Sequence, residues 1–155
     1  MTASTPARHT HAFTHIQSLP SWLAGRVAAR GRSLVTSALS GLGLRLPHHA
    51  VLAFVSERGP VAQAEMVREL GFDAKDVVLL LNDLERAELA IREPDPRDRR
   101  KNAVRVTARG ERTVLHCARL AERANAELLA PLSADDARHL VELLRRVQEG
   151  HRVPH

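Results

Sequence analysis

The sequence predicts a mainly helical α+β protein in which a helix-turn-helix is followed by a basic β-hairpin. Two observations support this fold class. Apolar residues recur at helical spacing before and after the central part of the chain. In that central part, Ile91-Arg92 and Val104-Arg105-Val106 alternate with the period of two that is typical of short, half-buried strands. The length of 155 residues allows one domain with a core of its own.

The composition favours a polyanionic partner and a reducing compartment. The formal net charge is +5, and the few aromatic residues include no tyrosine, which favours duplex over single-stranded nucleic acid. Cys117 is the only cysteine, so the chain cannot form an intrachain disulfide or a cysteine-rich zinc site. No signal-peptide pattern or long apolar run is present. We therefore expect a cytoplasmic protein without membrane contact.

The first part of the chain predicts a tail followed by a long helix. Residues 1–18 are polar and lack helical periodicity, which is typical of a flexible N-terminal tail. Apolar spacing over 19–41 predicts a helix whose small residues would let another helix approach closely. That helix belongs either to a partner subunit or to the same chain. The small residues are Ala24, Gly25, Ala28, Ala29 and Gly31.

Three further helices follow, and the last two form the predicted helix-turn-helix. Pro47 stands at a first-turn position of a helix that ends before Gly59. The next helix, over 61–70, ends at Gly71, and Asp73 is suited to cap the helix after it. Two short helices joined by a tight glycine turn are typical of a helix-turn-helix. The expected core face of the second helix is Val77, Leu80, Leu81 and Leu84.

The opposite face of this second helix is the candidate for reading a major groove. Its members are spaced three, four and seven residues from the first, so they share one side: Lys75, Val78, Leu79 and Asn82. Asn82 would pair with adenine, and Lys75 with guanine or a phosphate. Val78 and Leu79 would contact thymine methyl groups. Alternatively, these two apolar residues pack beneath a neighbouring element.

The hairpin carries a concentrated positive charge at its tip. Pro94 and Pro96 keep the connection out of the strand ladder, so the tip must project. Its cations are Arg97, Arg99, Arg100 and Lys101. Such a loop is self-repelling unless an anion lies between the cations, and a nucleic-acid backbone or groove supplies one. Asp95 and Asp98 are suited to brace the arginines, because a guanidinium pairs readily with a carboxylate.

Two helices are predicted after the hairpin. Thr107 can cap the first of them, which breaks at Pro131. Ser133 with Asp136 forms a capping box for the last helix, which ends at Gly150. Their combined apolar surface exceeds what a small domain can cover.

The segment L-E-R-A-E-L-A-I-R-E-P-D-P-R-D-R-R-K-N-A-V-R-V-T-A-R-G resembles MarR-type winged helix-turn-helix transcriptional regulators. It matches the end of their recognition helix, their wing and the start of the next helix. The most diagnostic parts are D-P-R-D-R-R at 95–100 and V-x-V-T-x-x-G at 104–110. The resemblance implies a single domain over 19–150, followed by a short tail. Its parts would be dimerisation helices at 19–45 and 108–150, a winged helix-turn-helix at 46–107, a wing at 90–107 and a C-terminal tail at 151–155.

By this resemblance, the protein would be a homodimeric regulator, most often a repressor, on pseudo-palindromic double-stranded DNA. Arg97, Arg99 and Arg100 would enter or flank a minor groove, with Asp98 orienting Arg100. Phosphates would be held by Gln63, Lys101 and Arg105, which set register without reading sequence.

The chain departs from the family pattern at two places. The positions of Lys75, Asp76, Val78 and Leu79 commonly carry Ser, Thr or Arg in relatives. Glu88 stands where relatives have the glycine that ends the recognition helix. A non-glycine residue in a left-handed conformation costs roughly 1 kcal/mol. The recognition helix could therefore end differently in this chain than in its relatives.

Relatives are often released from DNA by small aromatic or anionic molecules, so the resemblance implies a small-molecule effector and no cofactor. The effector would bind between the dimer helices and the winged domain. The residues expected to line the site are Trp22, Arg26, His48, His49, Phe54 and Arg119.

Other functional classes remain as alternatives. No nucleophile elbow, P-loop or HExxH motif is present, so we do not expect an enzyme. A winged domain adapted to protein contact would use Val78 and Leu79. A metal sensor would use His48, His49 and His116, although His116 lacks a second histidine one turn away. A redox sensor would use Cys117, which the apolar surroundings instead predict to be a packing residue.

Overall fold

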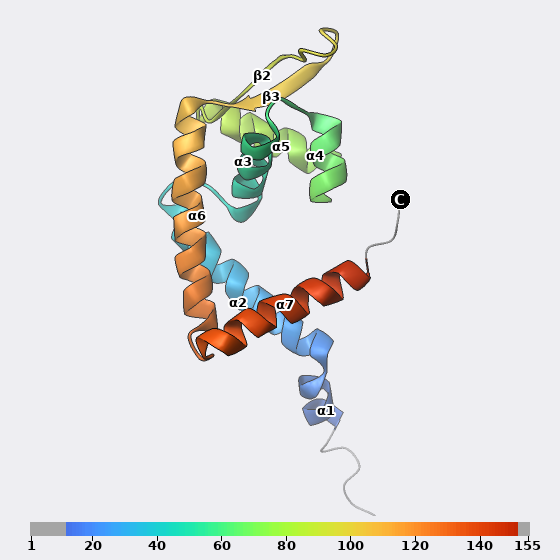
Figure 1. Ribbon diagram of the computed structural model, residues 1–155, viewed down its shortest axis with the longest axis vertical. Coiled ribbons are helices and arrows are strands. Elements are labelled where there is room, and N and C mark those ends of the chain that lie inside the picture. The colour runs from blue at the N-terminus through green and yellow to red at the C-terminus, as the bar shows by residue number, and fades with distance from the viewer. Residues whose placement is uncertain (1–11, 152–155) are drawn as a thin grey trace, which may run out of the picture.

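The computed structural model describes residues 12–151 and places them in a winged head and a helical part (Figure 1). The head holds the sheet and three short helices, while one long helix runs from the sheet into the helical part, and the first helix of the chain lies farthest from the head. In chain order the elements are α1 (Ala12–Ser18), α2 (Pro20–Ser40), α3 (Leu46–Arg58), β1 (Val61–Ala62), α4 (Gln63–Leu70), α5 (Ala74–Arg86), β2 (Ala90–Pro94), β3 (Asn102–Val106), α6 (Ala108–Leu129) and α7 (Ala134–Gly150).

The core of the head lies between α3, α5 and the sheet. Apolar side chains of each element fall on one side, as helical and strand periodicity require, and are removed from water. Burying each one stabilises the fold by roughly 1.5 to 3 kcal/mol. The largest contributors with almost no exposed surface are Val51, Leu52, Val55, Val61, Met66, Val77, Leu81 and Leu84.

The sheet has three antiparallel strands in the order β1-β3-β2. Strand β3 is central, with Val104 opposite Val61 on one side and Arg92 on the other. The strands of the wing, β2 and β3, lie where the sequence pattern predicts them. The prediction that the third helix begins at Val61 is wrong, because residues 61 and 62 pair with β3 before the helix starts.

Helix α5 ends in a left-handed turn even though Glu88 replaces glycine there. Glu88 has a φ of 58°. Its N–H donates to Glu85 O at 2.9 Å, and the Leu89 N–H donates to Leu84 O at 2.8 Å, which is the Schellman arrangement. The Thr107 hydroxyl also donates to Glu88 O at 2.8 Å. These hydrogen bonds offset the conformational cost, so the chain keeps the turn that leads into the wing.

Two long helices, α2 and α6, pack against each other and connect the head with the rest of the helical part (Figure 1). Gly31 permits this approach, since an added Cβ would lie 3.1 Å from Leu128 Cδ2. Arg30 and Glu127 form an exposed ion pair at 3.8 Å across the same contact. Part of the small-residue surface of the first long helix is thus covered by its own chain.

Helix α1 differs from the predicted tail. Ala12–Ser18 is helical, although the sequence analysis placed it in an irregular segment; residues 1–11 lie outside the described part. The Phe13 ring meets the Trp22 ring edge-to-face, with centroids 6.3 Å apart. This contact attaches α1 to α2, and it was missed because two isolated aromatic residues do not form a periodic pattern.

The last helix, α7, crosses the helical part without being buried by it. Ser133 caps it as predicted, accepting from the Asp136 N–H at 3.1 Å. No residue of α7 is buried, and α7 has no extensive contact with another element among residues 12–151. Within the same residues, no helix is long and apolar enough to cross a membrane.

The start of α6 presses closely on the turn after α5, and this contact supplies a stability test. A Cβ on Gly110 would lie 2.0 Å from Leu89 O and 2.4 Å from Val106 Cγ1. We expect Gly110→Ala to lower the free energy of unfolding by about 1 to 3 kcal/mol, measured by chemical denaturation.

The matched control for this variant is Gly25→Ala, where an added Cβ meets nothing within 4 Å. Alanine is a better helix former than glycine, so Gly25→Ala should be neutral or stabilising by up to roughly 1 kcal/mol. Equal effects of the two substitutions would contradict the close contact at Gly110.

Candidate nucleic-acid interface

Helix α5 presents two opposite faces. Asp73 caps its N-terminus, and its Oδ1 accepts from the Lys75 N–H at 3.4 Å. The predicted core face is buried, and the predicted outer face is exposed. Val78 is 37% exposed and Leu79 is 61% exposed. The alternative in which these two residues pack beneath a neighbouring element is therefore wrong, and all four outer residues face solvent.

A hollow of about 290 Å³ lies beside this outer face. It is lined by Arg45, Pro47, Phe72, Asp76, Leu79 and Leu80. Leu79 therefore lines a depression between α5 and the start of α3 whose wall is partly apolar and also includes the charged residues Arg45 and Asp76. Its apolar part can receive a base methyl group or another apolar group.

His48 connects the start of α3 with α5. Its Nδ1 accepts from the Arg45 N–H at 3.0 Å, so Nε2 carries the proton and donates to Asp83 Oδ2 at 3.1 Å. This hydrogen bond is the main reason why the pKa of Asp83 lies below its ordinary value. Because the ring is buried and both nitrogens are engaged, His48 positions α5.

Two Asp-x-Arg brackets organise the tip of the wing. Asp95 Oδ1 accepts from the Arg97 N–H at 2.8 Å and from Arg97 Nε at 3.3 Å. Asp98 Oδ1 accepts in the same way from Arg100 N at 3.1 Å and from Arg100 Nε at 3.2 Å. The bracing predicted from the sequence, including that of Arg100 by Asp98, is confirmed by these contacts.

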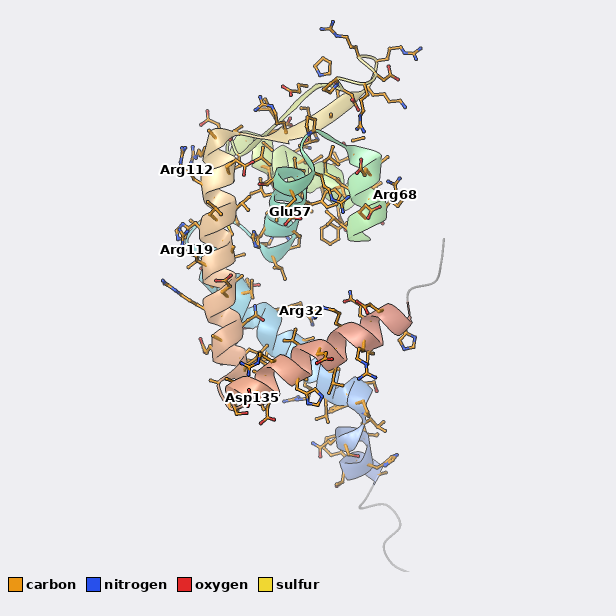
Figure 2. All side chains as sticks on the ribbon, in the orientation of Figure 1. Arg32, Glu57, Arg68, Arg112, Arg119 and Asp135 are labelled. Carbon is orange, nitrogen blue, oxygen red and sulfur yellow. The ribbon has the colours of Figure 1, made fainter. Side chains whose placement is uncertain are left out.

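The backbone closes this loop and directs its cations outward. Asp95 N–H donates to Lys101 O at 2.8 Å, and Lys101 N–H donates to Asp98 O at 2.9 Å. The side chains of Arg97 and Arg100 are 71% and 92% exposed. Figure 2 shows side chains projecting from the hairpin tip away from the head. The wing therefore holds its charges in a defined position while leaving them accessible.

Asp95 itself is almost completely buried, yet it stays ionised. The N–H of Arg97 is the main cause of a lowered pKa, and it outweighs the opposing effect of burial. Its carboxylate lies beside a wing hollow of about 370 Å³ that is also lined by Arg99. The charge of Asp95 is thus part of the structure of the loop.

Arg92 has a role that its place in the sequence pattern did not predict. It lies on β2, where its N–H donates to Glu85 Oε1 at 2.9 Å and its guanidinium pairs with Glu85 Oε2. Nη1 and Nη2 also donate to Asn82 Oδ1, at 3.2 and 3.1 Å. A sequence signal existed, since Asn82 and Glu85 are three residues apart on one side of the helix. The network joins the outer face of α5 to the wing.

The predicted phosphate contacts occupy different environments. Gln63 is half-buried at the first position of α4, where backbone N–H groups are available to an anion. Arg105 is exposed on β3, and its Nε donates to Glu93 Oε1 at 3.1 Å. Lys101 is exposed at the wing.

The residues predicted to line an effector pocket are not gathered in one chain. Trp22 and Arg26 are exposed on the first half of α2, which extends away from the head (Figure 1). Arg119 points outward from α6 (Figure 2), and His48 faces α5. Phe54 is half-buried beneath Arg58, whose guanidinium carbon lies 5.1 Å from the ring centroid. Neither hollow described above includes any of the six residues.

The residues named for metal or redox sensing occupy different environments. Within residues 12–151, no group of three or more His, Cys, Asp or Glu side chains is placed to hold a metal ion. His49 is half-buried, which lowers its pKa, and His116 is exposed on α6. Cys117 has no exposed surface, and burial raises the pKa of its thiol. The prediction that Cys117 is a packing residue is confirmed.

Comparison with known proteins finds similarity to the MarR family. A family model described as MarR family matches residues 42–101, from the end of α2 to the tip of the wing. Over this segment the chain is similar to the MarR family. A curated relative, the HTH-type transcriptional repressor Rv2887 of Mycobacterium tuberculosis, is 29% identical over 126 residues, which are 81% of this chain and 91% of that protein.

Solved structures of MarR-family proteins share the fold. The crystal structure of Rv2887 in complex with DNA has a TM-score of 0.73 and 28% identity, covering 84% of this chain and 98% of that one. The same protein with p-aminosalicylic acid has a TM-score of 0.70 and 27% identity, covering 84% and 99%. Wild-type MarR of E. coli without ligand has a TM-score of 0.74 and 25% identity, covering 83% and 96%.

The bracket at Asp95 supplies a test of the wing. Asp95→Asn removes a negative charge, which by itself should strengthen binding to DNA, but it also weakens the buried acceptor that holds Arg97, because an amide oxygen accepts less strongly than a carboxylate. We expect the loss of preorganisation to prevail, with affinity for duplex DNA falling by about threefold to tenfold in fluorescence anisotropy.

Asp135→Asn is the control for this variant, because it makes the same charge change at an exposed ion pair on α7. It should leave the affinity unchanged or slightly raised. If Asp95→Asn bound DNA more tightly than the wild type, charge rather than bracing would govern the wing.

Proposed function

We propose that this protein is a MarR-family, sequence-specific transcriptional repressor that binds a pseudo-palindromic operator in double-stranded DNA as a homodimer. The observation that carries this proposal is the pair of Asp-x-Arg brackets, which hold exposed cations on a projecting wing beside the exposed face of α5. Helix α5 is suited to a major groove and the wing to an adjacent minor groove. The relative Rv2887, whose DNA complex has the same fold, supports the assignment.

The two parts of the interface would perform different tasks. The outer face of α5 would contact base edges through Lys75, Val78, Leu79 and Asn82. The base preferred at each position would depend on the donors, acceptors or methyl groups that it presents. Arg97, Arg99, Arg100 and Lys101 would supply charge at the wing. Gln63 and Arg105 would contact phosphates, and for Arg105 this requires sharing its guanidinium with Glu93. The proposed binding to DNA would take place in the cytoplasm.

A second copy of the chain accounts for the apolar surface of the helical part. Large apolar side chains on α1, α2 and α7 are exposed in the single chain, and α7 buries none of its residues. Exposure of this extent is typical of an interaction surface. Residues that would be covered in the dimer include Leu19, Trp22, Leu23, Val27, Val141, Leu144 and Val147. A twofold axis would then present two wings and two α5 helices to one face of DNA.

An effector would act through this dimer. Rv2887 has been crystallised with p-aminosalicylic acid, which is an aromatic anion. We infer that a molecule of this class binds where the dimer helices meet the head and changes the spacing of the two α5 helices. Because Trp22 and Arg26 lie far from the head of their own chain, they could join such a site only through the partner subunit.

The proposal is tested by fluorescence anisotropy of the purified protein on the palindromic DNA upstream of its own coding sequence. A scrambled duplex is the control, and both titrations are repeated across a salt series. We expect a preference of roughly a thousandfold or more for the operator. Equal, steeply salt-dependent binding to both duplexes would mean that the wing contributes only nonspecific electrostatic attraction to DNA.

A second candidate function is protein contact through the apolar pair Val78 and Leu79, which is exposed beside the α5 hollow. The double variant Val78→Ser/Leu79→Ser separates the two functions. Loss of operator preference supports base reading, whereas unchanged DNA affinity with loss of a bound protein supports the second candidate.

The wing contact supplies the prediction for DNA. Arg100→Ala should weaken operator binding by about 1 to 3 kcal/mol and reduce the salt slope by about one. Arg138→Ala, which removes an exposed arginine of α7, is the control and should change neither quantity. Unchanged affinity of Arg100→Ala would remove this arginine from the interface.

The dimer supplies the prediction for assembly. Val147 is 62% exposed in the single chain, and Val147→Asp would place a charge in the proposed apolar interface. We expect sedimentation to show a dimer for the wild type and a shift toward monomer for this variant. Arg68→Asp adds an acidic side chain at the exposed surface of α4 and should stay dimeric. A dimeric Val147→Asp protein would exclude this face from the interface.

A further inference from the structure

Asn82 is the outer residue of α5 whose chemistry is most constrained by its neighbours. Asparagine has a carbonyl oxygen that accepts hydrogen bonds and an amide nitrogen that donates two. A free asparagine can rotate its amide and offer both functions to one base, which is how it pairs with adenine. The prediction that Asn82 reads adenine depends on that freedom.

The contact with Arg92 removes this freedom. Arg92 Nη1 and Nη2 lie 3.2 and 3.1 Å from Asn82 Oδ1. A guanidinium carries donors only, so the atom that faces it must be the carbonyl oxygen. The donor-only guanidinium therefore determines the orientation of the Asn82 amide, with the oxygen toward Arg92 and the nitrogen away from it. Both acceptor positions of Oδ1 are then occupied by Arg92.

Arg92 is itself fixed by a second contact. Its backbone N–H donates to Glu85 Oε1 at 2.9 Å, and its guanidinium pairs with Glu85 Oε2. The Arg92 side chain is 25% exposed and that of Glu85 is 31% exposed, so solvent competes little with the pair. Because β2 is at the edge of the sheet, this carboxylate also satisfies a strand N–H that has no strand partner. The ion pair with Glu85 thus holds the guanidinium in its position beside Asn82.

We propose that Arg92 is a specificity-determining residue, which holds Asn82 as a donor-only group and so directs it to guanine rather than to adenine. Asn82 is exposed on the face of α5 shared with Lys75 and Leu79, so its two amide N–H groups are available to a base. Guanine offers two neighbouring acceptors, N7 and O6, in the major groove. Adenine offers the acceptor N7 beside its N6 amino group, which is a donor. That amino group finds no free acceptor on Asn82, because Arg92 already occupies Oδ1. This inference rests on the proposed DNA-binding function.

The test is selection of duplexes from a pool with a randomised 20-base-pair segment by the full-length protein, followed by sequencing. The variants compared are wild type, Asn82→Ala, Arg92→Met and Arg86→Met. Asn82→Ala identifies the base pair that Asn82 contacts, because preference is lost there. Arg86→Met is the control for loss of one arginine, since Arg86 lies at the exposed end of α5 and pairs with Asp83.

We expect wild type and Arg86→Met to select guanine at the position identified by Asn82→Ala, with a preference of about tenfold over adenine. Arg92→Met frees the Asn82 oxygen, so this variant should accept adenine at that position while its other preferences remain. A residue that merely supported the fold would lower affinity without changing which base is selected.

The outcomes separate this inference from the function on which it rests. If the wild type enriches no sequence at all, the proposed function fails and this inference fails with it. If a motif is enriched but adenine is selected at the Asn82 position, or if Asn82→Ala relaxes no position, only this inference is overturned. Should Arg92→Met not fold by thermal unfolding, the comparison of wild type with Asn82→Ala still decides the base, because Asn82 is exposed.

Discussion

The interface depends on helix α5 being held from behind while its other face stays open. Val77, Leu81 and Leu84 are fully buried against the head, and this apolar contact fixes the rotation of the helix. A rotation by one residue position, about 100°, would carry part of this apolar face into solvent. The exposure of Val78 and Leu79 is thus a consequence of the burial of their neighbours.

Polar side chains refine the position that burial provides. His48 reaches Asp83 from α3, and Arg92 reaches Asn82 and Glu85 from β2, so α5 is held from both sides. The left-handed turn at Glu88 then leads into the wing, whose own cations are held by Asp95 and Asp98. These contacts therefore connect the helix and the wing into one surface.

Sequence patterns predicted most of this arrangement because the patterns are local. Helical spacing placed the helices, Pro and Gly marked their ends, and the two Asp-x-Arg brackets connect residues two positions apart. The contacts that were missed join distant segments: Arg92 with Asn82, His48 with Asp83, and Val61 with Val104. The six residues predicted for an effector pocket were chosen by resemblance, and no local rule specifies whether they converge.

The most direct test of the account is hydroxyl-radical footprinting of the full chain on its operator duplex. If two copies use α5 and the wing together, protection should be symmetric about the dyad, with two segments about one helical turn apart, roughly 10 base pairs, and minor-groove protection outside them. Protection by a single copy, or uniform protection along the duplex, would contradict the account.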